Sequence, residues 1–213
     1  MKNFLSAFFK KKESTQDSDT LVQENYLQDS PELVGYVNIN EQILTYNAML
    51  TFFNTSQSIL DVGCGRGDLF AFLKERYEDV FLDSNYYGID TSEPLINAGK
   101  ERYGINNIHV HDFVSFKNAS KFNWVFACNF FNEFKEDKYE YLYKCIDKMY
   151  NLSNHGIAFN IITDQANIQK EYDQYYSLYN AGEILNYLNL TYKKVITRSD
   201  YLVGDTTFYI FKQ

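Results

Sequence analysis

The stretch "SILDVGCGRGDLF", residues 58–70, carries three glycines at alternate positions directly after a short apolar run. They are Gly63, Gly65 and Gly67. Because glycine has no Cβ and tolerates positive φ, this spacing predicts a tight loop whose backbone lies directly against a ligand. The apolar run indicates a buried strand, and the residues from Asp68 onward indicate a helix. The loop is therefore expected at the carboxyl edge of a parallel sheet.

Short apolar runs alternate with helical patterns along the rest of the chain, which predicts βαβ crossovers and a mainly parallel sheet covered on both faces. Strands are expected at residues 58–62, 86–90, 108–111, 124–128 and 156–162, and helices at 68–77, 93–102 and 137–150. Near the end, Asn180 and Glu183 resemble a capping box that opens a helix through Leu190. Two strands joined by a short turn follow, and such neighbours pair antiparallel.

The 213 residues suit one domain with an extension at its start. Residues 1–30 are interpreted as a flexible tail and residues 31–213 as the domain. Within it, residues 31–55 form a helical cap, because apolar residues recur at helical spacing from Glu41 to Phe53.

The composition of the chain limits which partners and which cellular location we expect for the protein. The net charge of −8 argues against an extended nucleic-acid surface and favours neutral or cationic partners. The three cysteines lack CxxC spacing, so neither a disulfide framework nor a metal site is expected. Since no apolar run is long enough to span a bilayer, we expect a cytoplasmic protein without membrane association.

Acidic residues beside the glycines define the ligand further. The spacing GxGxG departs from the dinucleotide fingerprint GxGxxG, and this argues against nicotinamide and flavin cofactors. Asp61 precedes the first glycine by two residues and suits an ammonium group. Asp90 ends the second strand, where a carboxylate accepts hydrogen bonds from ribose hydroxyls. Asp112 could accept from an adenine amine, with Phe113 against the ring. The set predicts a ligand with amine, ribose and adenine, without phosphates.

Four stretches together make the sequence resemble the class I S-adenosylmethionine-dependent methyltransferases over about residues 33–213. They are "ILDVGCGRGD" (59–68), "YGIDTSEPLI" (87–96), "HVHDF" (109–113) and "WVFACNFFNEF" (124–134). The later part looks like members whose substrates are unassigned. The resemblance implies an α/β fold: a three-layer, Rossmann-like, seven-stranded, mostly parallel sheet with the last strand antiparallel, plus an N-terminal helical extension.

The same resemblance implies S-adenosylmethionine as cofactor and assigns roles position by position. The residues expected to face the cofactor are Asp61, Gly63, Cys64, Gly65, Gly67, Asp90, Thr91, Asp112, Phe113, Asn129 and Phe130. Of these, Thr91 would border the ribose, and Asn129 and Phe130 would lie beneath the sulfonium and its methyl group.

The acceptor side is less defined. Glu133 is the best-placed candidate for a general base, and its alternative reading is a solvated loop acid. Expected substrate contacts are Tyr36, Gln42, Asn132, Tyr175 and Tyr176. Residues 163–179 form a long stretch without period, and loops of this length are usually functional or disordered. Its tyrosines 172, 175, 176 and 179 either form an aromatic lid or pack on the helix at 41–53.

Three functional readings follow from the sequence. The first is a methyltransferase acting on a small-molecule or protein acceptor. The second keeps the fold but takes RNA or a nucleotide as acceptor, and it needs a basic surface at residues 10–12 or at Lys193 and Lys194. The third is a non-catalytic module that senses the cofactor or holds a partner. The acceptor atom, the use of a base and the oligomeric state stay open.

Overall fold

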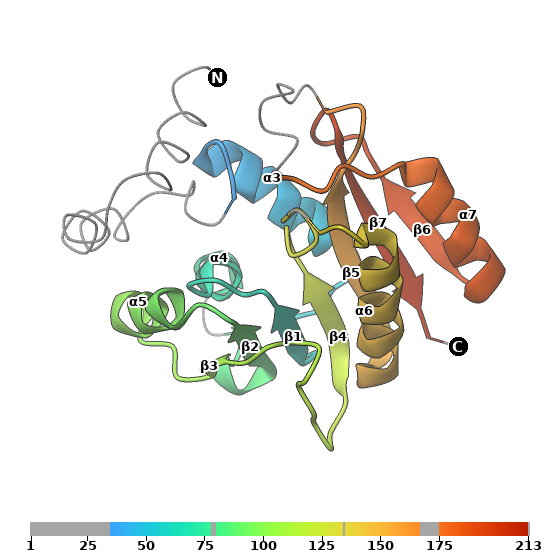
Figure 1. The fold of residues 1–213 in the computed structure, drawn as a ribbon. Helices are drawn as coiled ribbons and strands as arrows, with labels where there is room; N and C mark the ends of the chain where they lie inside the picture. Colours follow the sequence, from blue (N-terminus) through green and yellow to red (C-terminus); the bar gives the residue numbers. More distant parts are fainter. Residues whose placement is uncertain (1–34, 78–79, 134, 167–174, 213) are drawn as a thin grey trace.

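The computed structural model describes residues 35–77, 80–133, 135–166 and 175–212 (Figure 1). The predicted tail at 1–30, the basic run at 10–12 and Tyr172 lie outside the described residues. No helix within the described ranges is both long and apolar enough to cross a membrane.

A seven-stranded sheet with the strand order β3-β2-β1-β4-β5-β7-β6 forms the centre of the molecule. The strands β1 to β5 pair in parallel, whereas β7 runs antiparallel to both of its neighbours. The predicted seven-stranded, mostly parallel sheet with an antiparallel last strand is therefore confirmed. The strand bounds are β1 Ile59–Val62, β2 Tyr86–Asp90, β3 Ile108–Val110, β4 Phe122–Ala127, β5 Ser153–Ile162, β6 Val195–Arg198 and β7 Asp205–Phe211.

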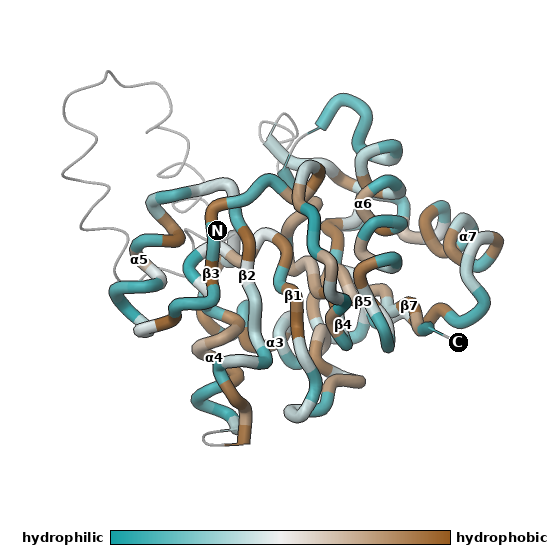
Figure 2. Tube along the Cα trace, turned by 90° about the horizontal axis from the view of Figure 1, so that it is seen from below, coloured by the Kyte–Doolittle hydropathy of each residue, from teal (hydrophilic) through white to brown (hydrophobic). Residues whose placement is uncertain are grey.

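Helices cover both faces of this sheet, so the fold has three layers (Figure 1). One buried cluster joins the sheet to α3 (Ile39–Met49), α4 (Asp68–Tyr77) and α5 (Glu93–Tyr103). The other joins it to α6 (Lys138–Leu152) and α7 (Ala181–Thr191). A short 3-10 helix, η3 (Asp83–Asn85), precedes β2. In Figure 2, hydrophobic segments gather along the central strands, and hydrophobic and hydrophilic residues alternate along α4, α6 and α7, as amphipathic surface helices require.

Side-chain caps explain where two of the helices begin. Asn180 accepts a hydrogen bond from the backbone N–H of Glu183 at 2.9 Å, as the capping pattern in the sequence predicts for α7. Ser92 caps α5 in the same way, by accepting from Leu95 at 3.4 Å. Because α5 starts directly after β2, this cap fixes the chain just past Asp90.

The first described helix differs from its prediction in length and in its buried face. Helix α3 ends at Met49 instead of Phe53, since the hydroxyls of Thr51 and Tyr209 donate to the carbonyl of Ala48. Such side-chain donors satisfy the free carbonyls of a last turn and end the helix there. Ile43, one of the apolar residues whose helical spacing predicts a buried face for this helix, is 38% exposed. The buried face instead carries Gln42, Thr45, Tyr46, Ala48 and Met49.

Candidate active site

A cavity of about 520 Å³ opens at the carboxyl edge of β1, β2 and β4. Most of the residues expected at the ligand site line it: Tyr36, Asp61, Gly63, Cys64, Gly65, Asp90, Thr91, Asp112, Phe113, Asn129, Phe130 and Glu133. The fold brings them together because parallel strands end at one edge of the sheet. Their individual roles stay predictions.

Five of the expected residues do not line the cavity: Gly67, Gln42, Asn132, Tyr175 and Tyr176. Gly67 has a φ of +79° and faces Ile105, which suits the packing of the turn before α4. Gln42 is buried, and its amide donates to the hydroxyl of Tyr46 at 3.1 Å. Gln42 therefore contacts Tyr46, which lines the cavity, and does not line it itself.

Asp61 is a buried carboxylate in which one oxygen accepts a hydrogen bond and the other does not. Its Oδ2 accepts a hydrogen bond from the hydroxyl of Tyr86 at 2.5 Å. Its Oδ1 has no hydrogen-bond partner among the described residues. Burial raises the pKa of Asp61 to about 7; the Tyr86 hydrogen bond opposes this rise, and the charges of Asp90 and Asp68 add to it. A cationic ligand group at Oδ1 would relieve this unfavourable burial.

The glycine loop is held against β2 and against an aromatic ring. The backbone N–H groups of Gly63 and Cys64 both donate to the carbonyl of Ile89, at 2.8 and 3.0 Å. Gly63 has a φ of +72°, and a Cβ there would lie 2.7 Å from Cδ2 of Phe130. Only glycine satisfies both conditions, because an L side chain is strained at this φ and would also collide with the ring.

Asp90 is anchored at the end of β2 by two backbone N–H groups. Its Oδ2 accepts from the N–H of Gly65 at 2.9 Å, and its Oδ1 accepts from the N–H of Ser92 at 2.8 Å. Each carboxylate oxygen can accept more than one hydrogen bond, so Asp90 retains capacity for a ligand. The same bonds tie the glycine loop to the start of α5.

Asp112 uses its carboxylate within its own loop. Its oxygens accept from the backbone N–H groups of Val114 at 3.2 Å and Ser115 at 3.1 Å. Asp112 thus stabilises its own loop, and its role toward adenine stays a prediction. Phe113 is buried next to it and meets the ring of Phe130 edge to face, with centroids 6.0 Å apart. The two rings form an apolar wall of the cavity.

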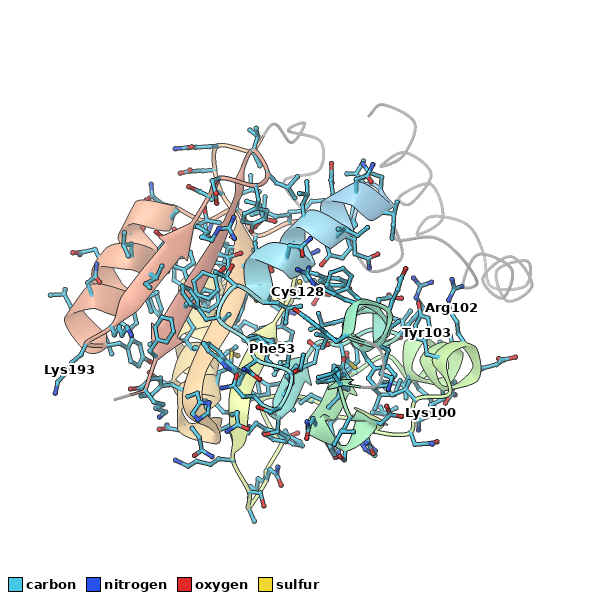
Figure 3. The ribbon with its side chains drawn as sticks, turned by 180° about the vertical axis from the view of Figure 1, so that it is seen from behind. Phe53, Lys100, Arg102, Tyr103, Cys128 and Lys193 are labelled. Atoms are coloured by element: carbon cyan, nitrogen blue, oxygen red, sulfur yellow. The ribbon has the colours of Figure 1, made fainter. Side chains whose placement is uncertain are left out.

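The opposite wall comes from the segment that leads into α3 and from α3 itself. Tyr36 and Tyr46 line the cavity, with their rings edge to face at 5.8 Å. The hydroxyl of Tyr36 lies 2.9 Å from Sγ of Cys128, and Figure 3 shows Cys128 next to α3. Burial raises the pKa of the Cys128 thiol far above its usual range, so the thiol stays neutral.

Asn129 follows β4 in an unusual backbone conformation. Its φ is +56°, the one positive value found at a non-glycine residue within the described ranges. Such a conformation costs about 1–2 kcal/mol and persists where the surroundings enforce it. Here the backbone N–H of Asn129 donates to Oδ1 of Asn160 on β5 at 2.7 Å. The strained residue lies at the cavity wall.

Glu133 lies at the rim of the cavity and is exposed. Its Oε2 pairs with Nζ of Lys135 at 2.9 Å, and 77% of its side chain is accessible to solvent. An exposed, paired carboxylate fits the reading of a solvated loop acid at least as well as that of a base. The hydroxyl of Ser177 donates to the carbonyl of Glu133 at 3.0 Å, so this rim is fastened to the segment before α7.

The tyrosines of the long segment before α7 lie in different environments. Tyr179 is fully buried, donates to the carbonyl of Phe131 at 3.1 Å and meets Tyr139 of α6 edge to face. Both proposed placements, a lid and packing on the helix at 41–53, are therefore wrong for Tyr179, which belongs to the core beneath α6. Tyr176 bridges Glu133 in an antiparallel arrangement at the rim.

The cavity is also lined by residues for which the sequence predicts no role at the site. They are Tyr46, Asp68, Leu69, Ile89, Leu95, His111, Cys128, Lys135 and Tyr141. Some had a detectable signal, because Cys128 and Lys135 flank the "NFFNEF" stretch and Asp68 follows the last glycine. Tyr46 and Tyr141 had none, since nothing in a helical pattern tells which aromatic side chain faces a ligand.

Residues 60–155 match the family model described as "Methyltransferase domain". These residues form a class I methyltransferase domain, a family that uses S-adenosylmethionine as its cofactor. The match runs from β1 to the start of β5, so it includes the glycine loop, Asp90 and Asn129. No curated protein matches the chain.

Solved structures with the same fold share little sequence with this chain. Magnesium protoporphyrin IX methyltransferase from Synechocystis PCC 6803, with bound SAH (S-adenosylhomocysteine), is 14% identical, with a TM-score of 0.62 over 92% of this chain and 95% of that one. The plantazolicin methyltransferase BpumL, in complex with a pentazolic desmethylPZN analog and SAH, is 18% identical, with a TM-score of 0.58 over 92% of each chain. A possible histamine N-methyltransferase from Thermotoga maritima is 9% identical, with a TM-score of 0.60 over 82% of this chain and 92% of that one. At these identities the likeness establishes the fold.

Proposed function

We propose that this methyltransferase binds S-adenosylmethionine in the 520 Å³ cavity and transfers its methyl group to a small-molecule or protein side-chain acceptor. The unsatisfied Oδ1 of Asp61 carries this proposal. A buried carboxylate oxygen without a donor costs free energy, and the ammonium of the cofactor's methionine part would supply the missing charge and hydrogen bonds. The glycine loop beside it leaves room for that part of the ligand.

The other end of the cavity suits the adenosyl part. Asp90 would accept from the ribose hydroxyls, with Thr91 beside them, and Phe113 would pack against adenine. Asp90 is fixed by two backbone N–H groups, so little ordering remains for it on binding. Asn129 and Phe130 would then lie next to the sulfonium.

Methyl transfer depends on the alignment of acceptor and cofactor more than on covalent chemistry by the protein. The bound cofactor supplies an electrophilic methyl group, and the protein holds the acceptor's nucleophile about 3–3.5 Å from it and in line. The aromatic side chains of Tyr36, Tyr46 and Tyr141 would restrict the acceptor and exclude water. A base is needed only for an acceptor that loses a proton. Glu133 stays our candidate, and it would have to leave Lys135 to act.

The charge of the lining favours neutral or cationic acceptors. Five carboxylates line the cavity, Asp61, Asp68, Asp90, Asp112 and Glu133, with Lys135 beside them at the rim. Asp68 pairs with Arg66 at 3.2 Å and Glu133 pairs with Lys135 at 2.9 Å, so the field that disfavours anionic acceptors comes from the other three carboxylates. The acceptors named for the related structures, a magnesium porphyrin and a plantazolicin analog, differ widely, so the fold alone does not select one.

The described residues give little support to RNA as the methyl acceptor. Lys193 lies at the far end of the molecule from Cys128, which marks the cavity (Figure 3). Its neighbour Lys194 has its Nζ over the ring of Phe211, at 4.5 Å from the centroid. This basic pair therefore does not border the cavity, as a phosphate-binding track toward the site would require.

The proposal is tested by incubating the protein with isotopically methyl-labelled S-adenosylmethionine and a cell extract, with and without ribonuclease. We expect label in the small-molecule or protein fraction by mass spectrometry, and no label with the Asp61→Asn variant. Label that ribonuclease removes would instead establish an RNA acceptor. Cofactor binding without label in any fraction would favour the non-catalytic module.

The pH dependence of cofactor binding gives a separate prediction. Only ionised Asp61 pairs with an ammonium group, and its pKa in the free protein is raised to about 7. The dissociation constant for SAH should therefore fall roughly eightfold from about pH 6 to about pH 7.5 and then level off. Isothermal titration at several pH values measures it.

Tyr86→Phe is the matched variant for this pH profile. It removes the hydrogen bond that favours the charged form of Asp61, so the midpoint of the profile should move to higher pH. Asp61→Asn should bind weakly and without this dependence. An affinity that stays constant across the range for the unmodified protein would exclude Asp61 as the partner of the ammonium.

A further inference from the structure

The side-chain amide of Asn160 has one possible orientation. One of its terminal atoms lies 2.7 Å from the backbone nitrogen of Asn129, which can only donate, so that atom is the oxygen. Its Nδ2 then donates to Oδ1 of Asn129 at 2.8 Å and to both carboxylate oxygens of Asp205 at 3.2 and 3.1 Å. A carboxylate and an amide oxygen are both acceptors, which agrees with this assignment.

The donor from Asn160 identifies the oxygen of the Asn129 amide, and a second donor, from Asn132, identifies the same atom independently. The backbone N–H of Ile162 donates to Oδ1 of Asn132 at 3.1 Å, so the nitrogen is the other terminal atom of that amide. This Nδ2 donates to Oδ1 of Asn129 at 3.0 Å. Two amide donors therefore fix the oxygen of Asn129, and its Nδ2 is left for the opposite side.

The described residues use little of the donor capacity of Asn129. Asn129 is one of the lining residues, and the hydrogen bond that the described residues offer its Nδ2 is a long one, 3.5 Å to the carbonyl of Gly35. The residues that hold it are buried: Asn160 is fully buried and Asn132 is 7% exposed. Asp205 is fixed in turn by the hydroxyl of Tyr201, which donates at 2.9 Å. The amide is thus held in place before any ligand arrives.

We propose that Asn129 determines acceptor specificity, by donating a hydrogen bond from Nδ2 to an uncharged oxygen of the methyl acceptor, such as a carbonyl or ether oxygen. An ammonium group offers only donors and cannot pair with Nδ2. A carboxylate would meet the negative field of Asp61 and Asp90 in the same cavity. This inference rests on the proposed function of the cavity and names the kind of group that enters beside the cofactor.

The test is an NMR titration of the full chain, labelled with nitrogen-15 and saturated with SAH. Two probes share one carbon skeleton: acetophenone, which only accepts hydrogen bonds, and 1-phenylethylammonium, which only donates them. Acetophenone is expected to shift the side-chain NH₂ resonance of Asn129 downfield and to slow its hydrogen exchange, whereas the ammonium probe should do neither. The resonance is identified by its absence from the Asn129→Asp variant.

Asn129→Asp also serves as the functional control, because a carboxylate still accepts from Asn132 and Asn160 while losing the donor. Affinity for acetophenone should fall roughly tenfold, and that for 1-phenylethylammonium should rise. Slow exchange of the NH₂ group with SAH alone would assign the donor to the cofactor and overturn the inference, as would equal affinity of both proteins for acetophenone. Absence of SAH binding would instead remove the proposed function itself.

Discussion

Replacing Asp90 with alanine is expected to weaken the binding of SAH by roughly 100-fold or more. The variant removes the acceptor that both ribose hydroxyls would share, and a hydrogen bond to a charged group contributes about 1.5–3 kcal/mol. Two such bonds correspond to at least about 3 kcal/mol, which is roughly 100-fold in the dissociation constant. The N–H of Gly65 also loses its partner at 2.9 Å, so the loop is held less firmly. Isothermal titration measures the change.

Asp83→Ala is the matched control for this variant. Asp83 precedes β2, is exposed and pairs with Lys74 at 3.0 Å. Because exposed ion pairs contribute little, Asp83→Ala should leave SAH affinity within about twofold of the unmodified protein. Denaturant unfolding of both variants separates a binding effect from a loss of fold. Equal affinities of the Asp90→Ala variant and the unmodified protein would show that the ribose lies elsewhere.

Gly63→Ala should have the second large effect, on stability and on binding together. The left-handed conformation of this residue strains alanine by about 1–2 kcal/mol. Its Cβ would also lie 2.7 Å from Phe130, and displacing the ring costs about 1–3 kcal/mol more. We expect the free energy of unfolding to fall by about 2–5 kcal/mol and SAH affinity to fall at least tenfold, because the displaced ring enters the cavity.

Gly104→Ala introduces the same backbone strain without a collision of the added Cβ. Gly104 ends α5 with a φ of +63°, and nothing lies within 4 Å of the Cβ that alanine would add. This variant should lose about 1–2 kcal/mol of unfolding free energy and keep its affinity for SAH. If both glycine variants lose the same stability and both bind SAH normally, the close approach of Phe130 to the loop has no functional consequence.

The sheet and its glycine loop could be predicted because their signals are local. Buried parallel strands read as short apolar runs, and the loop at Gly63 needs glycine for reasons that its own backbone dictates. The acids at the carboxyl ends of β1 and β2 could be placed at one edge because parallel strands share that edge. Asp61 and Asp90 therefore line one cavity, as expected from the sequence.

The parts that escaped prediction depend on contacts between distant segments. Asn129, Asn160 and Asp205 follow or belong to three different strands, and only the pairing of β4, β5 and β7 brings them together. The polar buried face of α3 likewise reflects what lies beneath it, since Gln42 and Tyr46 bond to each other inside the protein. An apolar periodicity carries no information about such partners.

The acceptor side of the site shows the same limit. Tyr36 was expected near the substrate and lines the cavity, whereas the equally aromatic Tyr179 is a core residue. A tyrosine suits both environments, because its ring packs in a core while its hydroxyl finds a carbonyl, as Tyr179 does with Phe131. Only the fold separates the two cases.

Isothermal titration of the unmodified protein with SAH and, in parallel, with NAD⁺ decides whether the cavity is an adenosyl site that excludes phosphates. Both ligands contain adenine and ribose, but only SAH carries an ammonium for Asp61, and only NAD⁺ carries a pyrophosphate. We predict one SAH bound per chain, weakened by Asp61→Asn, and no heat from NAD⁺. Binding of NAD⁺ in place of SAH, or binding of neither, would contradict this assignment of the cavity.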